Sequence, residues 1–195
     1  MEKISSNIQT DLPVEIKEKK PLPVWAIALA FALLFGFLVL LALGLRNAQE
    51  GPIGIGQTVP DFELTSFDGT VYKTSDYSGK VIVVNFWASW CQPCESEAAD
   101  LEKAWQYYKP SGDVIFLGVD YVDTEPEALA YLDKFGITYP NGPDLRTKIS
   151  QMFRILGVPE TYIIDRNGRL VYMKKGPFYN LNEITAAIDG VLQSD

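Results

Sequence analysis

An uncharged apolar run near the N-terminus constrains this chain more than any other feature. Residues Val24 to Leu45, VWAIALAFALLFGFLVLLALGL, form 22 consecutive residues without a charged side chain. As an α-helix they would extend about 33 Å, which matches a hydrocarbon layer about 30 Å thick. Trp25 stands near its start, where an aromatic side chain favours the membrane interface. The run predicts a transmembrane helix over residues 24–45.

A cleaved secretory signal is the alternative interpretation of this run. The apolar core of such signals usually has about 7–15 residues, and here a polar segment of 23 residues precedes it. We therefore expect an uncleaved anchor. Lys17, Lys19 and Lys20 precede the run and only Arg46 closely follows it. The positive-inside rule then predicts a cytoplasmic N-terminus and an extracytoplasmic C-terminal part in the bacterial cell membrane.

The rest of the chain divides by composition. Residues 1–23 are polar and contain three prolines, which predicts a disordered cytoplasmic tail. Residues 46–60, RNAQEGPIGIGQTVP, are rich in glycine and predict a flexible linker. Residues 61–195 then form the extracytoplasmic domain.

Charge and composition exclude several function classes. Residues 51–195 carry 12 basic and 20 acidic side chains, so this part offers no electrostatic footprint for nucleic acid. The chain has no histidine, which removes imidazole metal ligands, histidine-dependent nucleophilic catalysis and the C-x-x-C-H haem signature. We expect no metal and no cofactor beyond a redox-active disulfide.

Strand-like and helix-like patterns alternate from about residue 61. DFELTSFDGTVYK predicts a hairpin, while KVIVVNFWAS and DVIFLGVDYV predict strands buried on both faces. Helical spacing follows over about 93–108, 125–135, 145–153 and 181–192, and TYIIDRNGRLVYMKK predicts a second hairpin. TYPNGPD is expected to be a loop. The order predicts an α/β domain with a mixed central sheet flanked by helices and an added N-terminal β-hairpin.

The two cysteines of the chain lie in one window, NFWASWCQPC. Cys91 is placed where a buried strand has ended and a helix begins, so free backbone N–H groups and the positive helix end stabilise a thiolate there. Cys94, one turn later, can attack a mixed disulfide and release the partner. A disulfide across so short a loop adds little stability. The spacing therefore indicates a redox centre.

These residues resemble the active-site segment of thioredoxin-like proteins. Together with the anchor, the first hairpin and GVPETYIIDRNG, the segment resembles the membrane-tethered TlpA/ResA/CcmG (DsbE) family over about residues 57–193. The resemblance implies a thioredoxin-like fold, with Cys91 as the attacking and Cys94 as the resolving cysteine. It also implies that Trp90 packs beside the site.

The resemblance extends to GVPET. Pro159 matches the family's cis-proline, and its loop, with Val158 and Glu160, would offer backbone groups to a substrate strand. Glu160 also matches a residue that could tune the thiols or contact a partner.

The resemblance further implies a role for Glu97, one helical turn after Cys94, as a carboxyl that exchanges a proton with this thiol. A solvated glutamate in the first turns of the helix is the alternative. Asn85 stands where thioredoxin has a buried aspartate, and an amide cannot exchange protons.

The neighbourhood of the cysteines predicts the direction of the reaction. Glu95, Glu97 and Asp100 are acidic and disfavour a thiolate, which points to a reductant rather than an oxidant. The resemblance implies protein disulfides as substrates, among them apocytochrome c, and a transmembrane thiol electron donor of the CcdA/DsbD type. The lipid bilayer would be a further partner through residues 24–45.

Three other interpretations of the function of the cysteine pair remain open: a peroxidase, a copper chaperone and an interaction module. Peroxiredoxins carry Thr or Ser three residues before the peroxidatic cysteine and a proline further upstream, where this chain has Ala88 and Val84. Copper chaperones of the Sco type use C-x-x-x-C with a distant histidine. In an interaction module the cysteines would be incidental.

Overall fold

The computed structural model describes residues 23–48 and 53–194, in two compact units split at residues 50 and 51. The first unit contains helix α1 (Val24–Ala48), of which Val24–Gly44 is long and apolar enough to cross a membrane, with mean hydropathy 2.9. The helix runs three residues past the predicted span, through residues that tolerate helical backbone. Most of the predicted tail, residues 1–22, and residues 49–52 of the predicted linker lie outside the described residues.

The second unit is built on a five-stranded mixed sheet in the order β5-β4-β3-β6-β7. Its strands are β3 (Val81–Trp87), β4 (Val114–Asp120), β5 (Asn141–Pro143), β6 (Glu160–Ile164) and β7 (Leu170–Lys175). The β3–β4 and β4–β5 pairs are parallel, while β3–β6 and β6–β7 are antiparallel. Every residue of β3 and β4 is buried, as their continuous apolar runs predict.

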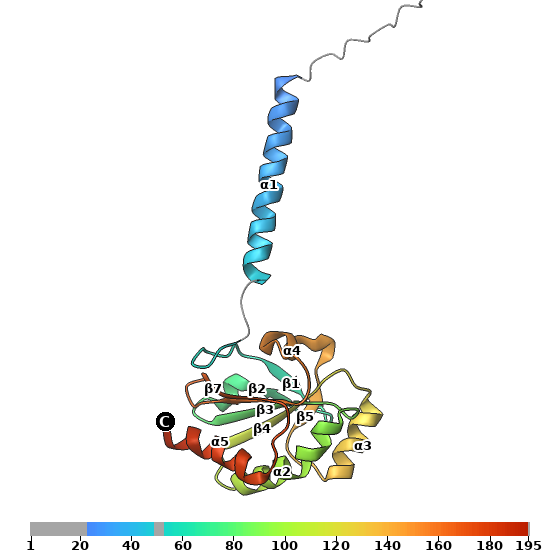
Figure 1. Ribbon diagram of the computed structural model, residues 1–195, viewed down its shortest axis with the longest axis vertical. Helices are drawn as coiled ribbons and strands as arrows, with labels where there is room; N and C mark the ends of the chain where they lie inside the picture. The colour runs from blue at the N-terminus through green and yellow to red at the C-terminus, as the bar shows by residue number, and fades with distance from the viewer. Residues whose placement is uncertain (1–22, 49–52, 195) are drawn as a thin grey trace, which may run out of the picture. The chain divides into compact units, whose positions relative to one another are not determined.

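Helices cover both faces of this sheet. They are α2 (Gln92–Tyr108), α3 (Glu125–Phe135), α4 (Lys148–Phe153) and α5 (Leu181–Ser194), with short 3₁₀ segments η1 (Thr74–Tyr77) and η2 (Leu145–Thr147). Helix α2 packs against α5 and α3, and α4 lies on the opposite face of the sheet (Figure 1). The apolar core lies between these layers. This is the α/β arrangement that the sequence predicts.

The predicted N-terminal hairpin forms a sheet of its own. Strand β1 (Glu63–Thr65) pairs with β2 (Val71–Lys73), and Gly69 at φ 85° makes the turn. The hairpin is attached to β5, because the Phe67 N–H donates to the Asn141 carbonyl at 2.9 Å. Strand β5 itself lies in the segment expected to be a loop. Pairing with β4 at the sheet edge overrides the turn-like composition of this segment.

Part of the predicted linker belongs to the folded unit. The Val59 N–H donates to the Gly168 carbonyl at 2.9 Å, and the Leu170 N–H donates to the Gln57 carbonyl at 2.9 Å. The Val59 side chain is buried in the core. The fold therefore begins several residues before position 61, because this segment finds hydrogen-bond partners beside β7.

A tryptophan at the end of β3 ties three strands together. The Trp87 Nε1–H donates to Asn141 Oδ1 on β5 at 2.8 Å, across β4. A side chain at Gly118 on β4 could not fit, since its Cβ would lie 1.7 Å from Asn141 Oδ1. The Trp87 ring also stacks on Tyr131 of α3 at 4.4 Å. This buried cluster supports the end of the sheet from which the Cys91 loop departs.

Candidate active site

Cys91 and Cys94 form a disulfide at the start of helix α2. Cys91 is the N-cap of the helix, and its Sγ accepts a hydrogen bond from the Cys94 N–H at 3.2 Å. Pro93 is in the first turn, where no intrahelical N–H bond is lost. Cys91 is 4% exposed and Cys94 is fully buried. The positive end of the helix therefore faces the sulfur of Cys91, as the sequence predicts.

The loop that presents Cys91 is bonded to the segment after β4. The Ser89 N–H and hydroxyl donate to the Asp123 carboxylate at 2.6 and 2.9 Å. The Trp90 Nε1–H donates to the Val122 carbonyl at 3.1 Å, and the Trp90 side chain is 60% exposed. Trp90 thus lies next to the disulfide in sequence and offers an apolar surface to solvent. Asp123, which the sequence analysis did not single out, fixes this loop.

Residues before β6 lie against the cysteines. The Val158–Pro159 peptide bond is cis, as the resemblance implied, and Val158 packs against the cluster that contains Cys91 and Cys94. Pro159 is buried, and its carbonyl accepts from the Gly176 N–H at 2.9 Å. The structure therefore brings this loop and the disulfide together.

Glu97 is buried one helical turn after Cys94, with an exposed fraction of 1%. Its Oε1 accepts from Asn85 Nδ2 at 3.0 Å, and its Oε2 accepts from the Phe178 N–H at 2.8 Å. Burial raises the pKa of Glu97 to about 7, although the Phe178 N–H and the Asn85 amide favour the charged form. The solvated alternative does not hold. Glu97 can take up and release a proton near neutral pH.

Asn85 has a defined part in this arrangement. Its Nδ2 donates to both Glu97 Oε1 and Thr161 Oγ1, each at 3.0 Å. The amide therefore joins strands β3 and β6 to helix α2. Thr161 was not anticipated, because only the antiparallel register of β3 and β6 places it opposite Asn85.

Glu160 lies away from solvent, with an exposed fraction of 3%. Its carboxylate accepts from the Leu156 N–H at 2.9 Å and from the Tyr162 hydroxyl at 2.5 Å. These bonds hold the loop before Pro159. The carboxylate is thus already engaged by hydrogen bonds. Leu156, 82% exposed, is a large apolar side chain that this loop presents to solvent.

A second buried acid, Asp120, ends strand β4 beside Trp87 of β3. It is 2% exposed, and its Oδ1 has no hydrogen-bond partner among the described residues. Burial and the neighbouring Asp123 carboxylate raise the pKa of Asp120 to about 7. The sequence analysis missed this acid, although an aspartate at the carboxyl end of a buried strand was a usable signal.

The other acidic neighbours of the cysteines are neutralised at the surface. Glu95 Oε1 lies 2.9 Å from Lys134 Nζ, and Asp100 Oδ1 lies 2.8 Å from Lys103 Nζ. Such exposed pairs contribute little to a buried site. Of the three acids on α2 near the cysteines in sequence, Glu97 is therefore the one that is buried within the fold.

No group of three potential metal-ligating side chains occurs in the described part of the chain. The positions that a peroxidase would fill with Thr or Ser and with Pro hold Ala88 and Val84, both fully buried. A disulfide at a helix N-terminus, a cis-proline loop and a mixed sheet of this order define a thioredoxin-like thiol-disulfide oxidoreductase.

Comparison with known proteins agrees with this class. The model of the AhpC/TSA family matches residues 55–173. The thiol-disulfide oxidoreductase ResA of Geobacillus kaustophilus is 33% identical over 122 residues, which cover 63% of this chain and 70% of that protein. ResA of Bacillus cereus is 28% identical over 129 residues, covering 66% and 74%.

Solved structures show the same fold. A thiol:disulfide interchange protein of the thioredoxin family from Chlorobium tepidum is 25% identical with a TM-score of 0.65, covering 71% of this chain and 98% of that one. A secreted disulfide oxidoreductase of Mycobacterium tuberculosis homologous to DsbE is 19% identical with a TM-score of 0.60, covering 66% and 95%, and it supports the fold alone. The chain belongs to the AhpC/TSA family and, within it, to the thioredoxin-like thiol-disulfide oxidoreductases of the ResA/DsbE type.

Proposed function

We propose that this protein is a membrane-anchored reductase of disulfides in extracytoplasmic proteins. The observation that carries the proposal is the Cys91–Cys94 pair with buried Glu97 one turn further along α2. The ionised form of this buried acid disfavours a thiolate on the pair, and a less stabilised thiolate makes the dithiol a better electron donor.

The reaction proceeds in two exchanges. The Cys91 thiolate attacks one sulfur of the substrate disulfide, which forms a mixed disulfide and releases the first substrate thiolate. Cys94 transfers its proton to the ionised Glu97 carboxylate and attacks the Cys91 sulfur. The second substrate thiolate leaves, takes up a proton, and two electrons have passed to the substrate. Trp90 and the loop of Val158 and Pro159 hold the substrate chain, and Glu160 holds that loop.

Helix α1 supports the anchoring. Its apolar length suits a bilayer, and the lysines before it orient the N-terminus toward the cytoplasm. The catalytic domain, about residues 54–195, then works outside the cytoplasm of a bacterial cell. Protease added to intact spheroplasts is expected to remove this domain, and protection of the domain would contradict the orientation.

The substrate class is supported by the relatives, which are named thiol-disulfide oxidoreductase ResA and thiol:disulfide interchange protein. We propose apocytochrome c, with its C-x-x-C-H disulfide, as one substrate. A transmembrane thiol protein of the CcdA/DsbD type would return electrons to Cys91 and Cys94, since the chain has no other cysteine.

The first test is the reduction potential of the pair in the full chain in detergent micelles. A potential near or below that of thioredoxin, about −270 mV, supports a reductase. A potential near that of DsbA, about −120 mV, makes the protein an oxidant and overturns the proposed direction.

A trapping variant identifies the substrate. Cys94→Ser leaves the mixed disulfide on Cys91 unresolved, and mass spectrometry of the trapped species is expected to find C-x-x-C-H peptides. Cys91→Ser is the matched control and is expected to trap nothing. If only proteins without the C-x-x-C-H motif are trapped, the proposed role becomes general disulfide reduction and not cytochrome maturation.

A further inference from the structure

The segment between β7 and α5, residues 176–180, contacts the buried carboxylate of Glu97. We call this segment the strap. At its start the Gly176 N–H donates to the Pro159 carbonyl at 2.9 Å. Two residues later the Phe178 N–H donates to Glu97 Oε2 at 2.8 Å, and the Phe178 side chain is 2% exposed. The strap therefore contacts both the acid beside the cysteines and the cis-proline loop.

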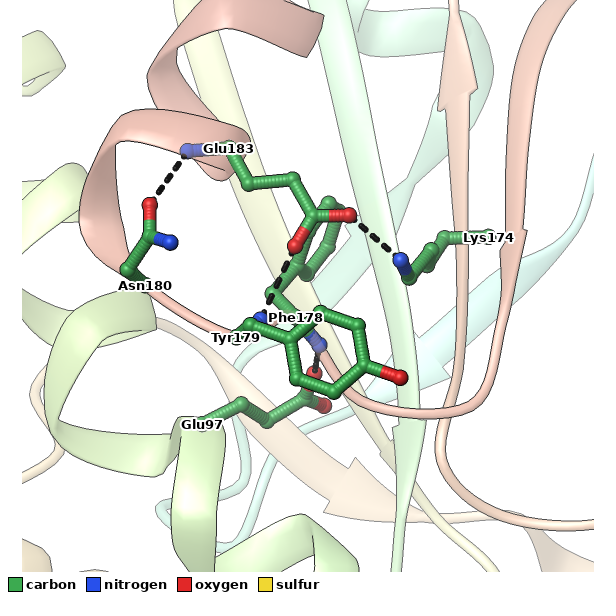
Figure 2. Close-up of polar contacts among 6 residues, drawn as sticks. All are labelled: Glu97, Lys174, Phe178, Tyr179, Asn180 and Glu183. Carbon is green, nitrogen blue, oxygen red and sulfur yellow. Dashed lines mark hydrogen bonds and ion pairs between the residues drawn. The ribbon is translucent and has the colours of Figure 1, made fainter.

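An ion pair holds the strap from its other side. Lys174 of β7 pairs with Glu183 Oε1, and Glu183 Oε2 accepts from the Tyr179 N–H at 2.9 Å. The Glu183 N–H donates in turn to Asn180 Oδ1 at 3.0 Å. Figure 2 shows the consecutive N–H groups of Phe178 and Tyr179 bonded to the carboxylates of Glu97 and Glu183. The two acids are thus linked through one short piece of backbone.

Lys174 contacts aromatic rings as well as its acidic partner. Lys174 Nζ lies 5.0 Å from the centre of the Tyr179 ring and 5.7 Å from that of Phe178. The Phe178 ring stacks on Tyr172 of β7, with an interplanar angle of 9°. The two cation–π contacts add to the ion pair in holding Lys174 over the strap, and the stack on Tyr172 holds the Phe178 ring beneath it.

Side chains from several elements interact with Glu97 through a hydrogen bond or through charge. They are Asn85 on β3, Tyr131 on α3, Tyr139 before β5, Lys174 on β7 and Glu183 on α5, and Cys94 precedes Glu97 by one turn of α2. Burial raises the pKa of Tyr131 and Tyr139, so both phenols are neutral at neutral pH. Within the described part of the chain, Lys174 and Glu183 are therefore the charges that act on Glu97, with opposite signs.

We propose that Lys174 and Glu183 are positioning residues that set how readily the buried Glu97 releases its proton. The inference rests on the proposed role of Glu97 as the proton acceptor of Cys94. The positive charge of Lys174 favours the ionised carboxylate, and the negative charge of Glu183 opposes it. The balance of these two charges, together with the Phe178 N–H, sets the pH above which Glu97 is ionised and can accept the Cys94 proton.

Two substitutions shift this balance in opposite directions. Lys174→Met leaves Glu183 uncompensated, so the pKa of Glu97 is expected to rise by about 0.5–1 unit. Glu183→Gln leaves Lys174 uncompensated, and the glutamine oxygen still accepts from the Tyr179 N–H, so the pKa is expected to fall by about as much. The double variant is expected to return close to the native value.

The test is a ¹³C NMR titration of the Glu97 carboxyl carbon in the oxidised full chain in detergent micelles. The Glu97→Gln variant assigns the signal. Glu63→Gln removes the acid of the exposed Lys73–Glu63 pair on the hairpin and serves as the matched control, with no expected change.

Opposite shifts that cancel in the double variant support the proposal. Unchanged midpoints, or shifts of one sign in both single variants, would mean that the pair only holds the strap in place, and would overturn it. The pH profile of disulfide reduction is measured on the same proteins. If the NMR midpoints move and the rate profile does not, the proposed catalytic role of Glu97 fails while the control by Lys174 and Glu183 stands.

Discussion

Two buried acids, Glu97 and Asp120, have similar pKa values but different hydrogen-bond partners. Both have a pKa raised to about 7, first of all by burial. Glu97 has an N–H donor on each oxygen, from Asn85 and Phe178. Asp120 has no partner on Oδ1 and lies beside the Asp123 carboxylate. The environment of Glu97 accommodates either protonation state, whereas that of Asp120 favours only the protonated one.

The difference shows that a raised pKa alone does not identify a proton carrier. A group that exchanges protons during turnover needs support for its charged form as well as its neutral form. Glu97 has this support and lies on the same helix as Cys94. Asp120 lacks it, and its neighbour Asp123 instead holds the loop of Ser89. We expect Glu97 to affect the reaction and Asp120 to affect stability.

The largest expected effect is that of Glu97→Gln on the rate. The resolving step is expected to slow by about 100-fold at pH 7, because Cys94 loses its proton acceptor. In the native protein the rate is expected to rise with pH through about 7, where Glu97 ionises, and this inflection disappears in the variant. Stopped-flow measurement of mixed-disulfide resolution tests this. If the variant keeps the pH–rate profile of the native protein, Glu97 is not the proton acceptor, and it does not differ from Asp120 in this respect.

Asp120→Asn is expected to change stability instead. Because the folded-state pKa lies above the unfolded value, stability is lost as pH rises from about 4, the unfolded-state pKa, through about 7. The amide can donate to Asp123 at any pH, so the gain of the variant in unfolding free energy is expected to be roughly 2 kcal/mol larger at pH 8.5 than at pH 4. Urea unfolding at both pH values measures this. An equal change at the two values would show that Asp120 is not protonated in the native protein.

Asn85→Asp would make the Glu97 region resemble that of Asp120. Glu97 loses a donor and gains a carboxyl neighbour, so the apparent pKa of the pair rises by about one unit and the rate profile moves to higher pH. The pH–rate profile is the measurement. Thr161→Val removes the other partner of Asn85 without adding charge and is expected to leave the profile in place. A profile that does not move in Asn85→Asp would mean that the amide does not support the charged form of Glu97.

The smallest effect is expected at an exposed acid of the same helix. Glu95→Gln removes the surface pair with Lys134, which is worth less than about 0.5 kcal/mol. Neither the unfolding free energy at pH 7 nor the pH profile should change measurably. A shift comparable to that in Glu97→Gln would show that surface charge, rather than burial, sets the acidity around Cys94.

Local sequence was sufficient for much of the site. The Cys91–Cys94 pair, the strand before it and the helix after it depend on residues close together in the chain, so periodicity and spacing predicted them. The cis bond at Pro159 could be expected only from the family resemblance, because most prolines are trans. The edge strand β5 was taken for a loop, since its three residues adopt extended pairing only beside β4.

The sequence by itself determined that a redox pair lies at a strand–helix junction, C-terminal to an apolar helix. Only the tertiary structure decided which acids are buried and what supports them. Phe178 is 81 residues away from Glu97 along the chain, and Thr161 is 76 residues from Asn85. Burial and hydrogen-bond partners of this kind arise when distant segments pack together. No local sequence pattern predicts them. They set the pKa of Glu97, on which the proposed chemistry depends.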